Sequence, residues 1–224
     1  MLILALDTSG QLGSMALARG ANEPFSVLEQ VSLAGRTYSA RLIPELSSLL
    51  TRRHLQIQDL EAFAVVSGPG SFTGLRVGLS SVKALAEVLK RPITAISMLQ
   101  AIAAQSGAKG RILAAFDAGR KEVYAGEYDL AGAEPKLVGE SLLTRAEFLS
   151  LLAAGTAAEL VTPDPALSDL ASGRLRVKQV QWPGAGEIAR LGLTRISTGQ
   201  TVAVETLDAN YIRRSDAEIF SSPR

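Results

Sequence analysis

Apolar positions recur along the chain with two periods, and together they predict an alternation of strands and helices. Short apolar runs bounded by turn residues are typical of strands, whereas apolar residues three and four positions apart are typical of helices. The runs predict strands at 1–6, 13–18, 25–31, 62–66 and 92–96, and the wider spacing predicts helices at 39–50, 72–89 and 98–105. This part of the chain is therefore expected to form a mixed α/β lobe.

The same pattern then starts again. Residues 112–119 repeat the character of residues 3–10, because each segment is an apolar strand that ends in an aspartate and a turn of small residues. Each is followed by a return strand, at 13–18 and 123–128. Further strands are predicted at 136–141 and 159–162, and helices after Thr144, from Asp164 and at 186–193. We expect a duplicated α/β architecture with a cleft between two lobes, 1–106 and 107–208, followed by a tail at 209–224.

The stretch from Ser67 to Gly78 connects a predicted strand to a predicted helix through a glycine-rich turn, with Ser71 as the expected N-cap. Such a turn can bind a phosphate at the helix N-terminus. However, no lysine follows the last glycine as the Walker pattern requires, and Thr73 stands where a dinucleotide motif has its third glycine. The alternative is a strand, turn and helix in which small residues allow close packing.

Two aspartates, Asp7 and Asp117, are predicted at equivalent strand ends. If they faced each other across the cleft, the pair could hold a hydrated magnesium ion or position a water molecule. The residues after the first aspartate, Thr8, Ser9 and Gly10, could offer hydroxyls and amides to a phosphate. The alternative is that each aspartate only makes an Asx-type hydrogen bond within its own turn.

Composition narrows the chemistry. The chain has 224 residues and a net charge of +1, with no basic tract, so it has little electrostatic attraction for nucleic acid on its own. It has no cysteine and a single histidine, His54, which leaves no thiolate site and no histidine pair. No run approaches the length of a membrane span, and no signal peptide is recognised, so we expect a cytoplasmic protein without a membrane partner.

Four segments, in order and correctly spaced, resemble the TsaB (YeaZ-type) family of bacterial tRNA threonylcarbamoyladenosine modification. They are Leu4–Ser9, Gly68–Gly78, Asp117–Tyr124 and Tyr211–Arg213. The resemblance covers almost the whole chain. It implies the two-lobed actin-like/RNase H-like (ASKHA) fold of the α/β class, in which each lobe is a mixed sheet opened by a β-hairpin and flanked by helices.

The resemblance also implies a non-catalytic role. The catalytic relative TsaD is expected to carry a His-x-x-x-His metal pair where this chain has Met98 and Ile102, which cannot bind a hard or borderline metal. No catalytic or metal-binding residue is therefore predicted, and no cofactor is required by this chain. By resemblance it is an accessory subunit that binds TsaD and the ATPase TsaE. The resemblance implies that ATP and metal are bound by those partners and that tRNA is bound through the complex. In isolation the chain is expected to form a homodimer.

By the same resemblance, the helices at 38–50 and 72–89 pair with TsaD. The predicted interface residues are Tyr38, Arg41, Leu42, Glu45, Ser71, Thr73, Gly74, Val77, Gly78 and Ser81. Gly74, Gly78 and Ser81 would form a flat face for close crossing, and Gly78→Glu is expected to abolish pairing without unfolding the chain. The alternative is that both glycines let the helix lie against its own sheet. Many relatives have a histidine where this chain has Tyr38.

Three further hypotheses remain. Tyr211 and Ile212 are expected to dock on the first lobe, with Arg213 and Arg214 either solvated or touching tRNA or TsaE. The alternative function is an ATPase or small-molecule kinase that uses Asp7 and Asp117. A metallopeptidase would need metal ligands that the sequence does not provide.

Overall fold

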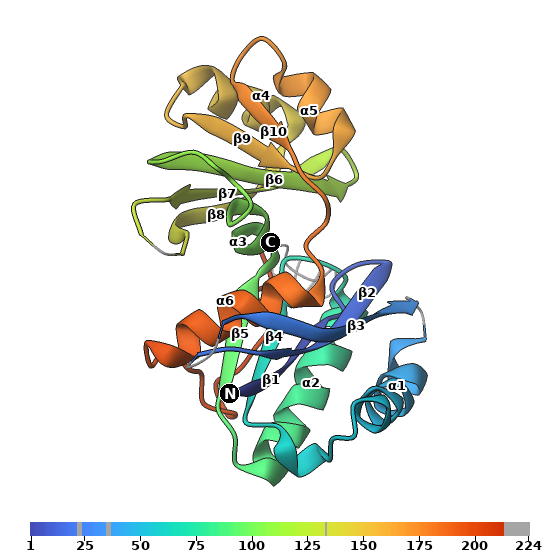
Figure 1. The fold of residues 1–224 in the computed structure, drawn as a ribbon. Helices are drawn as coiled ribbons and strands as arrows, with labels where there is room; N and C mark the ends of the chain where they lie inside the picture. The colour runs from blue at the N-terminus through green and yellow to red at the C-terminus, as the bar shows by residue number, and fades with distance from the viewer. Residues whose placement is uncertain (22–23, 35–36, 133, 213–224) are drawn as a thin grey trace. The chain divides into compact units, whose positions relative to one another are not determined.

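The computed structural model describes residues 1–21, 24–34, 37–132 and 134–212 (Figure 1). The chain forms two compact units, which are described separately. Among the described residues, unit one contains Met1–Met98 and Pro183–Ala209, and unit two contains Leu99–Trp182 and 210–212. In the described part of the chain, no helix has the length and apolar character that a membrane span requires.

Unit one is built on a five-stranded sheet in the order β3-β2-β1-β4-β5. Its strands are β1 (Leu2–Asp7), β2 (Leu12–Arg19), β3 (Ser26–Ala34), β4 (Ala62–Gly68) and β5 (Ile93–Ser97). β1, β2 and β3 are antiparallel neighbours, whereas β4 is parallel to β1 and β5 is parallel to β4. β1 and β4 are buried along their whole length, which explains why they appear in the sequence as continuous apolar runs.

Two helices cover one side of this sheet (Figure 1). They are α1 (Tyr38–Arg52) and α2 (Phe72–Leu89), with the short 3₁₀ helix η1 (Ile57–Asp59) between them. α2 begins where the Ser71 hydroxyl accepts a hydrogen bond from the amide of Gly74, as expected of an N-cap. The apolar positions predicted for its inner side are buried at Leu75, Leu79, Val82 and Ala86, whereas Leu89 is half-buried and Phe72, also predicted there, is exposed. Amphipathic spacing therefore predicted this helix and its core-facing side.

A helix from the other end of the chain covers the opposite side of the sheet. α6 (Ala185–Ser197) contacts β1, β2, β4 and β5. Its N-cap, Gly184, has no side chain to cap the helix; instead the Ala185 amide donates to Ser14 Oγ and the Gly186 amide to Gln30 Oε1, each at 2.8 Å. Since unsatisfied helix amides are costly when buried, these acceptors attach α6 to unit one.

Unit two repeats the same arrangement in a second sheet, in the order β10-β9-β6-β7-β8. Its strands are β6 (Arg111–Gly119), β7 (Glu122–Asp129), β8 (Lys136–Thr144), β9 (Glu159–Thr162) and β10 (Arg176–Gln179), and its other helices are α4 (Arg145–Ala154) and α5 (Pro165–Ala171). Again three antiparallel strands are followed by two parallel ones. The predicted duplication of a mixed α/β sheet with flanking helices is confirmed. β10 was not predicted, because its sequence is mostly polar.

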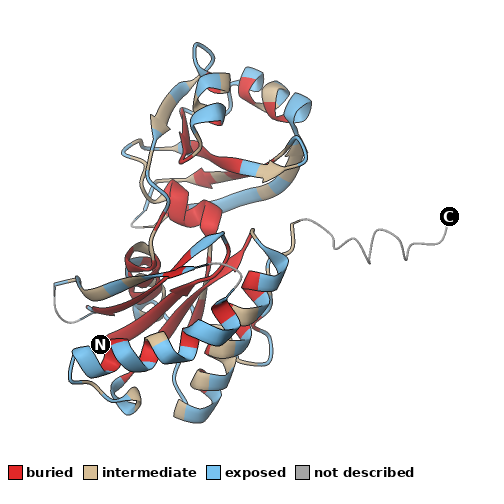
Figure 2. Cartoon of the chain, turned by 90° about the vertical axis from the view of Figure 1, so that its right-hand side faces the viewer, coloured by how far each residue is buried: buried red, intermediate tan, exposed pale blue. Residues whose placement is uncertain are grey.

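The core of unit two lies between this sheet and the helices α4 and α5. It contains Leu113, Ala115, Val123, Ala125, Phe148, Leu152, Leu160, Leu167 and Ala171. α3 (Met98–Ala103) is buried throughout, and Gln100 Nε2 donates to the carbonyl of Pro135 at 3.0 Å. Figure 2 shows that the strands are mostly buried, whereas the larger helices present exposed residues on one side.

The unit boundaries differ from the predicted lobes 1–106 and 107–208. The chain passes into unit two at Leu99, the second residue of α3, and returns to unit one at Pro183, before α6. The tail also differs from the expectation that it docks on the first lobe. Residues 210–212 belong to unit two, where Asn210 Nδ2 donates to Glu140 Oε2 of β8 at 2.6 Å. Arg213 and Arg214 lie outside the described residues.

A buried hydroxyl gives a test of this packing. Within the described part of the chain, Thr94 Oγ1 on β5 is buried and has no hydrogen-bond partner, so Thr94→Val should raise the free energy of unfolding by about 1 kcal/mol. Thr162 is the matched control, because it is equally buried but its hydroxyl accepts from the Asp164 amide at 3.1 Å. Urea denaturation should show that Thr162→Val has a lower free energy of unfolding than the original chain. A similar loss of stability in Thr94→Val would contradict the conclusion that the Thr94 hydroxyl has no hydrogen-bond partner.

Candidate functional site

The predicted phosphate-facing residues, 7–10, form the turn between β1 and β2, and this turn packs against the N-terminus of α2. The amide of Ser71 donates to the carbonyl of Ser9 at 2.7 Å, and the hydroxyl of Thr8 donates to the carbonyl of Gly74 at 2.8 Å. The structure thus brings together two motifs that the sequence analysis had treated separately, the aspartate turn and the glycine-rich turn.

Asp7 is buried at the end of β1. Its Oδ1 accepts two hydrogen bonds from Ser9, one from the amide at 2.8 Å and one from the hydroxyl at 2.6 Å. Desolvation by burial raises the pKa of Asp7 above its usual range, and the two bonds from Ser9 offset only part of that rise. The aspartate therefore makes the Asx-type bond of the structural alternative and stabilises its own turn.

Tyr38, the first residue of α1, joins the same assembly. Its hydroxyl donates to the carbonyl of Gly10 at 2.8 Å. Burial raises the pKa of Tyr38 to about 12, and the nearby charge of Asp7 contributes to the rise. Tyr38 was predicted as a partner contact, but it is buried and attaches α1 to the turn. In this chain the residue at the start of α1 is thus a structural one.

Three of the donors that were predicted to bind a phosphate are already used within the protein. The Thr8 hydroxyl donates to Gly74, while the Ser9 hydroxyl and amide both donate to Asp7. Thr8 and Ser9 are only 1% and 6% exposed, and Gly10 alone of the turn is exposed. A phosphate could displace these bonds only by opening the turn, so the geometry favours a structural turn over a nucleotide site.

Gly74 and Gly78 are buried against this turn rather than displayed on the outside of α2. A Cβ at Gly74 would lie 2.0 Å from the backbone oxygen of Thr8, and a Cβ at Gly78 would lie 2.3 Å from Thr8 Oγ1. No side chain fits at either distance. The predicted partner face of Gly74 and Gly78 is therefore corrected: these residues let α2 approach its own sheet. Gly78→Glu is consequently expected to disturb the fold itself.

The other predicted interface residues divide by exposure. Arg41, Ser71 and Thr73 are exposed, Glu45, Val77 and Ser81 are half-buried, and Leu42 is a core residue of α1. Arg41 forms an ion pair with Glu45 one helical turn later, at 2.5 Å.

The predicted interface did not include three exposed apolar side chains on the same helices: Ile43 (54% exposed), Phe72 (39%) and Val88 (80%). Ile43 and Val88 neighbour core positions in the sequence, so the apolar pattern alone could not assign them to the outside.

Asp117 belongs to unit two and is exposed near the end of β6. Its Oδ2 accepts from the Gly119 amide at 3.2 Å, and its own amide donates to Asp164 Oδ2 at 3.3 Å. Asp164 in turn caps α5 through the Ala166 amide. Because Asp7 belongs to unit one, pairing of the two aspartates remains a prediction.

No metal-binding cluster of three His, Cys, Asp or Glu side chains occurs among the described residues. Met98 and Ile102, which stand where the metal pair of TsaD is expected, are both buried in α3.

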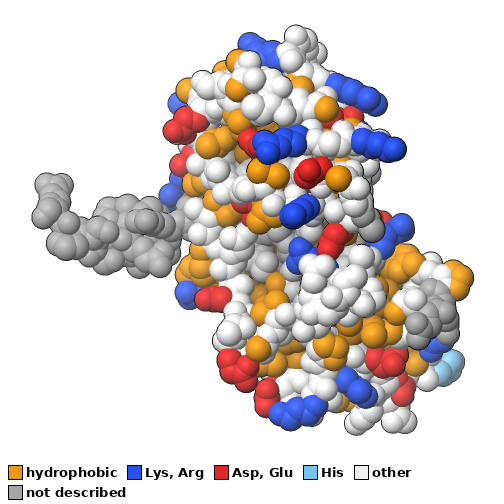
Figure 3. Space-filling view, turned by 90° about the vertical axis from the view of Figure 1, so that its left-hand side faces the viewer, with side chains coloured by type: hydrophobic (Ala, Val, Ile, Leu, Met, Phe, Trp, Pro, Cys, Tyr) orange, Lys and Arg blue, Asp and Glu red, His pale blue; other side chains and the backbone are white. Residues whose placement is uncertain are grey.

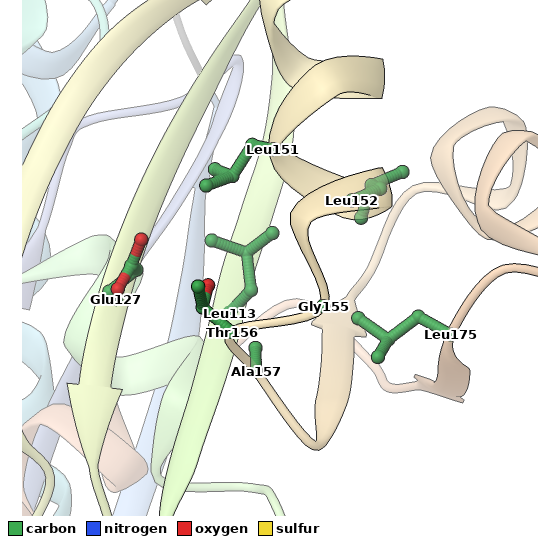
Figure 4. A pocket seen from close by; sticks show the side chains of 8 residues that line it. All are labelled: Leu113, Glu127, Leu151, Leu152, Gly155, Thr156, Ala157 and Leu175. Carbon is green, nitrogen blue, oxygen red and sulfur yellow. The ribbon is translucent and has the colours of Figure 1, made fainter.

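Figure 4 shows a hollow in unit two beside β6 and α4, lined by Leu113, Glu127, Leu151, Leu152, Gly155, Thr156, Ala157 and Leu175. Its volume of about 10 Å³ is close to the minimum for one water molecule. The hollow is mostly apolar and contains none of the predicted site residues. Because of its small volume, it cannot receive a substrate.

These features first define a class: a duplicated α/β protein in which the turn of the first β-hairpin is bonded to the helix α2 of the same unit. The family model for TsaD, tRNA N6-adenosine threonylcarbamoyltransferase, matches residues 30–189. The tRNA threonylcarbamoyladenosine biosynthesis protein TsaB of Escherichia coli (strain K12) is 32% identical over 97% of this chain and 96% of that protein. The TsaB protein of Bacillus subtilis (strain 168) is 36% identical over 68% of this chain and 66% of that protein. The chain belongs to the TsaB (YeaZ-type) family.

Solved structures agree. YeaZ from Pseudomonas aeruginosa superposes with a TM-score of 0.73 at 26% identity, covering 94% of this chain and 99% of that one. A second structure, described as an uncharacterized protein from P. aeruginosa with similarity to peptidase YEAZ, gives a TM-score of 0.78 at 28% identity over 95% and 99% of the two chains. Both likenesses extend over both units.

The contact between Thr8 and α2 predicts a specific double-mutant result. Gly78→Ala should cost about 1–3 kcal/mol through overpacking, and Thr8→Ala about 1 kcal/mol through the lost hydrogen bond. Because the atom that obstructs Gly78→Ala is Thr8 Oγ1, the double variant should lose less than the sum. Gly74→Ala meets a backbone oxygen, so Thr8→Ala should not rescue it. Urea denaturation measures the original chain, the three single variants and the two double variants; full additivity for Gly78→Ala would contradict the contact.

Burial of Asp7 predicts the pH dependence of stability. The folded state binds the proton more tightly than the unfolded state, so stability falls as pH rises from the unfolded pKa of about 4 through the raised folded pKa. Asp7→Asn keeps the acceptor for Ser9 without the buried charge, and should have a higher Tm at pH 7 by a margin that narrows toward pH 4. Asp169→Asn, on the exposed side of α5, controls for loss of a carboxylate. A margin that widens on acidification would contradict this account.

Proposed function

We propose that this chain is a non-catalytic subunit of the machinery that makes N6-threonylcarbamoyladenosine in tRNA. In this proposal TsaD transfers the threonylcarbamoyl group from its adenylate to adenosine 37, and TsaE is the ATPase. Metal and ATP are bound by those partners, and tRNA is bound through the complex. The protein functions in the cytoplasm. The proposal is supported by the TsaB relatives, which are named for threonylcarbamoyladenosine biosynthesis.

The arrangement of side chains supports a non-catalytic role. The turn at Asp7 uses its hydroxyl donors internally, and the position of the expected metal pair is filled by Met98 and Ile102 as packing residues. Neither of these side chains can serve as a general base or as a ligand for a hard metal. The ATPase or kinase alternative would require the turn to open, and no observation favours it.

One observation carries the proposal: apolar side chains of α1 and α2 are exposed to solvent. We call Arg41, Ile43, Phe72, Thr73, Val77 and Val88 the α1–α2 surface. Phe72 is covered on one side by the guanidinium of Arg76, 3.8 Å from the ring centroid. Apolar residues surrounded by polar ones are typical of the helices of a protein interface. We propose that TsaD binds this surface and that, without TsaD, a second copy of the chain binds it.

Charges placed on this surface test the proposal. Ile43→Asp and Val88→Asp should weaken the complex with TsaD by tenfold or more, because an unpaired carboxylate would be desolvated at the interface. They should leave the Tm within a few degrees of the original value, since both side chains are exposed.

The matched control is Leu137→Asp, on β8 of unit two, where the leucine is 56% exposed. Co-purification and analytical sizing with TsaD measure the result for all three variants. Equal loss of binding in Leu137→Asp, or undiminished binding in both helix variants, would refute the α1–α2 surface. ATP turnover by the isolated chain, abolished by Asp7→Ala and Asp117→Ala, would favour the alternative function.

A further inference from the structure

Three aromatic side chains of unit two are in contact with one another, in a row that leads from the interior to the surface. Trp182 packs edge-on against Phe116, with ring centroids 5.3 Å apart, and Phe116 contacts Tyr124 at 5.2 Å. Phe116 and Tyr124 are opposite each other on β6 and β7 and are almost fully buried. Trp182 is 55% exposed. The stack therefore begins in the protein interior and ends with one large ring in contact with water.

The backbone beside Trp182 is fixed, so the ring has a defined support. The Val180 amide donates to the carbonyl of Thr162 at 3.0 Å, and the Gln181 carbonyl accepts from Gln105 Nε2 at 3.0 Å. Pro183 follows immediately and is buried. A ring held in this way loses little conformational entropy when a ligand covers it.

Two cations lie at the tip of the same hairpin. Arg120 and Lys121 form the turn between β6 and β7, and both are exposed, with φ of 54° and 65°. Positive φ in two successive residues usually selects Asn and Gly, so long cationic side chains are an unusual choice here. At about 3.3 Å per residue, the tip lies roughly 10–13 Å from Phe116 along the strand. A short ligand could therefore contact both the ring and the cations.

We propose that Trp182, supported by Phe116, is a stacking platform for an unpaired base of RNA, with Arg120 and Lys121 near the adjoining phosphates. Proteins recognise single-stranded RNA by stacking bases on aromatic rings beside cationic side chains. Asp117, Glu122 and Asp164 occur at the same end of the sheet and place negative charge beside the two cations. The inference rests on the proposed function, because the RNA would be the tRNA that the complex modifies.

Charge and shape favour RNA over a free nucleotide. The net charge is +1, and on the face drawn in Figure 3 cations are interspersed with carboxylates, so a broad electrostatic attraction is absent there and stacking must contribute. Sites for small molecules are usually concave. Trp182 is instead an exposed ring, and the hollow of Figure 4 in the same unit is lined by other residues.

The fluorescence of Trp182 provides the test, because it is the single tryptophan of the chain. The probe is a synthetic RNA stem-loop with unpaired adenines, titrated into the full chain and compared with a fully paired RNA of the same length. Quenching by the stem-loop, with at least tenfold weaker quenching by the duplex, is the expected result. RNA binding without a change in fluorescence would overturn the proposal, as would comparable quenching by AMP or ATP at the same concentration.

Variants separate stacking from charge, with binding followed by anisotropy of labelled RNA. Trp182→Ala should weaken binding about tenfold, whereas Trp182→Phe should keep most of the affinity. Lys121→Gln should lower the slope of log affinity against log salt by about 1. Lys136→Gln, at the opposite end of the hairpin partner β8, should leave the slope unchanged. Affinity and slope that do not change in Trp182→Ala and Lys121→Gln would overturn the proposal.

The same variants distinguish this inference from the proposed function. Trp182→Ala and Lys121→Gln should still co-purify with TsaD, because neither residue belongs to the α1–α2 surface. If the original chain fails to bind TsaD, the proposed function is wrong. If the complex forms but Trp182→Ala binds RNA as well as the original chain does, only the stacking platform is wrong.

Discussion

The close approach of α2 to the turn after β1 is the constraint on which unit one depends. It requires glycine at positions 74 and 78, because any Cβ there would collide with Thr8. Once that approach is made, Thr8 bonds to the helix, Ser9 bonds to Asp7, and Tyr38 brings α1 onto the same turn. The two hydroxyls and the Ser9 amide, which could have held a phosphate, thereby become structural. The same packing leaves the opposite side of α1 and α2 in solvent, which is where the proposed interface lies.

The duplication produces two units, and each unit includes a helix that is adjacent in sequence to the sheet of the other unit. α3 follows the first sheet in sequence but belongs to unit two, whereas α6 follows the second sheet but covers the first. Hydrogen bonds fix both choices: Gln100 bonds to the carbonyl of Pro135, and the first amides of α6 bond to Ser14 and Gln30. Each unit therefore needs a segment from the other half of the sequence to complete its hydrogen bonding. A truncation at the predicted lobe boundary would remove α6 from the first sheet and expose the side that it covers.

Much of this fold could be predicted from the sequence, because buried strands appear as continuous apolar runs and the aspartate-ended strand occurs twice. The sequence could not predict which sheet each helix covers, because an apolar stripe does not identify the sheet against which it packs. The hydrogen-bond acceptors for the first amides of α6 lie 171 and 156 positions earlier in the chain. β10 was missed because its residues are mostly polar. Gly74 and Gly78 were assigned to a partner because small residues allow close approach equally to another protein or to Thr8. Only the structure distinguishes the two.

The fold, the internally bonded turn and the TsaB relatives support a protein that acts through its surface rather than through chemistry of its own. The most direct test is reconstitution with purified TsaD, TsaE, ATP, the threonylcarbamoyl donor and tRNA, with modified adenosine quantified by mass spectrometry. The account predicts product only when this chain is present, together with a stoichiometric complex of this chain and TsaD. Full product formation in its absence, or ATP turnover by this chain alone at the rate of the complete mixture, would contradict the central claim.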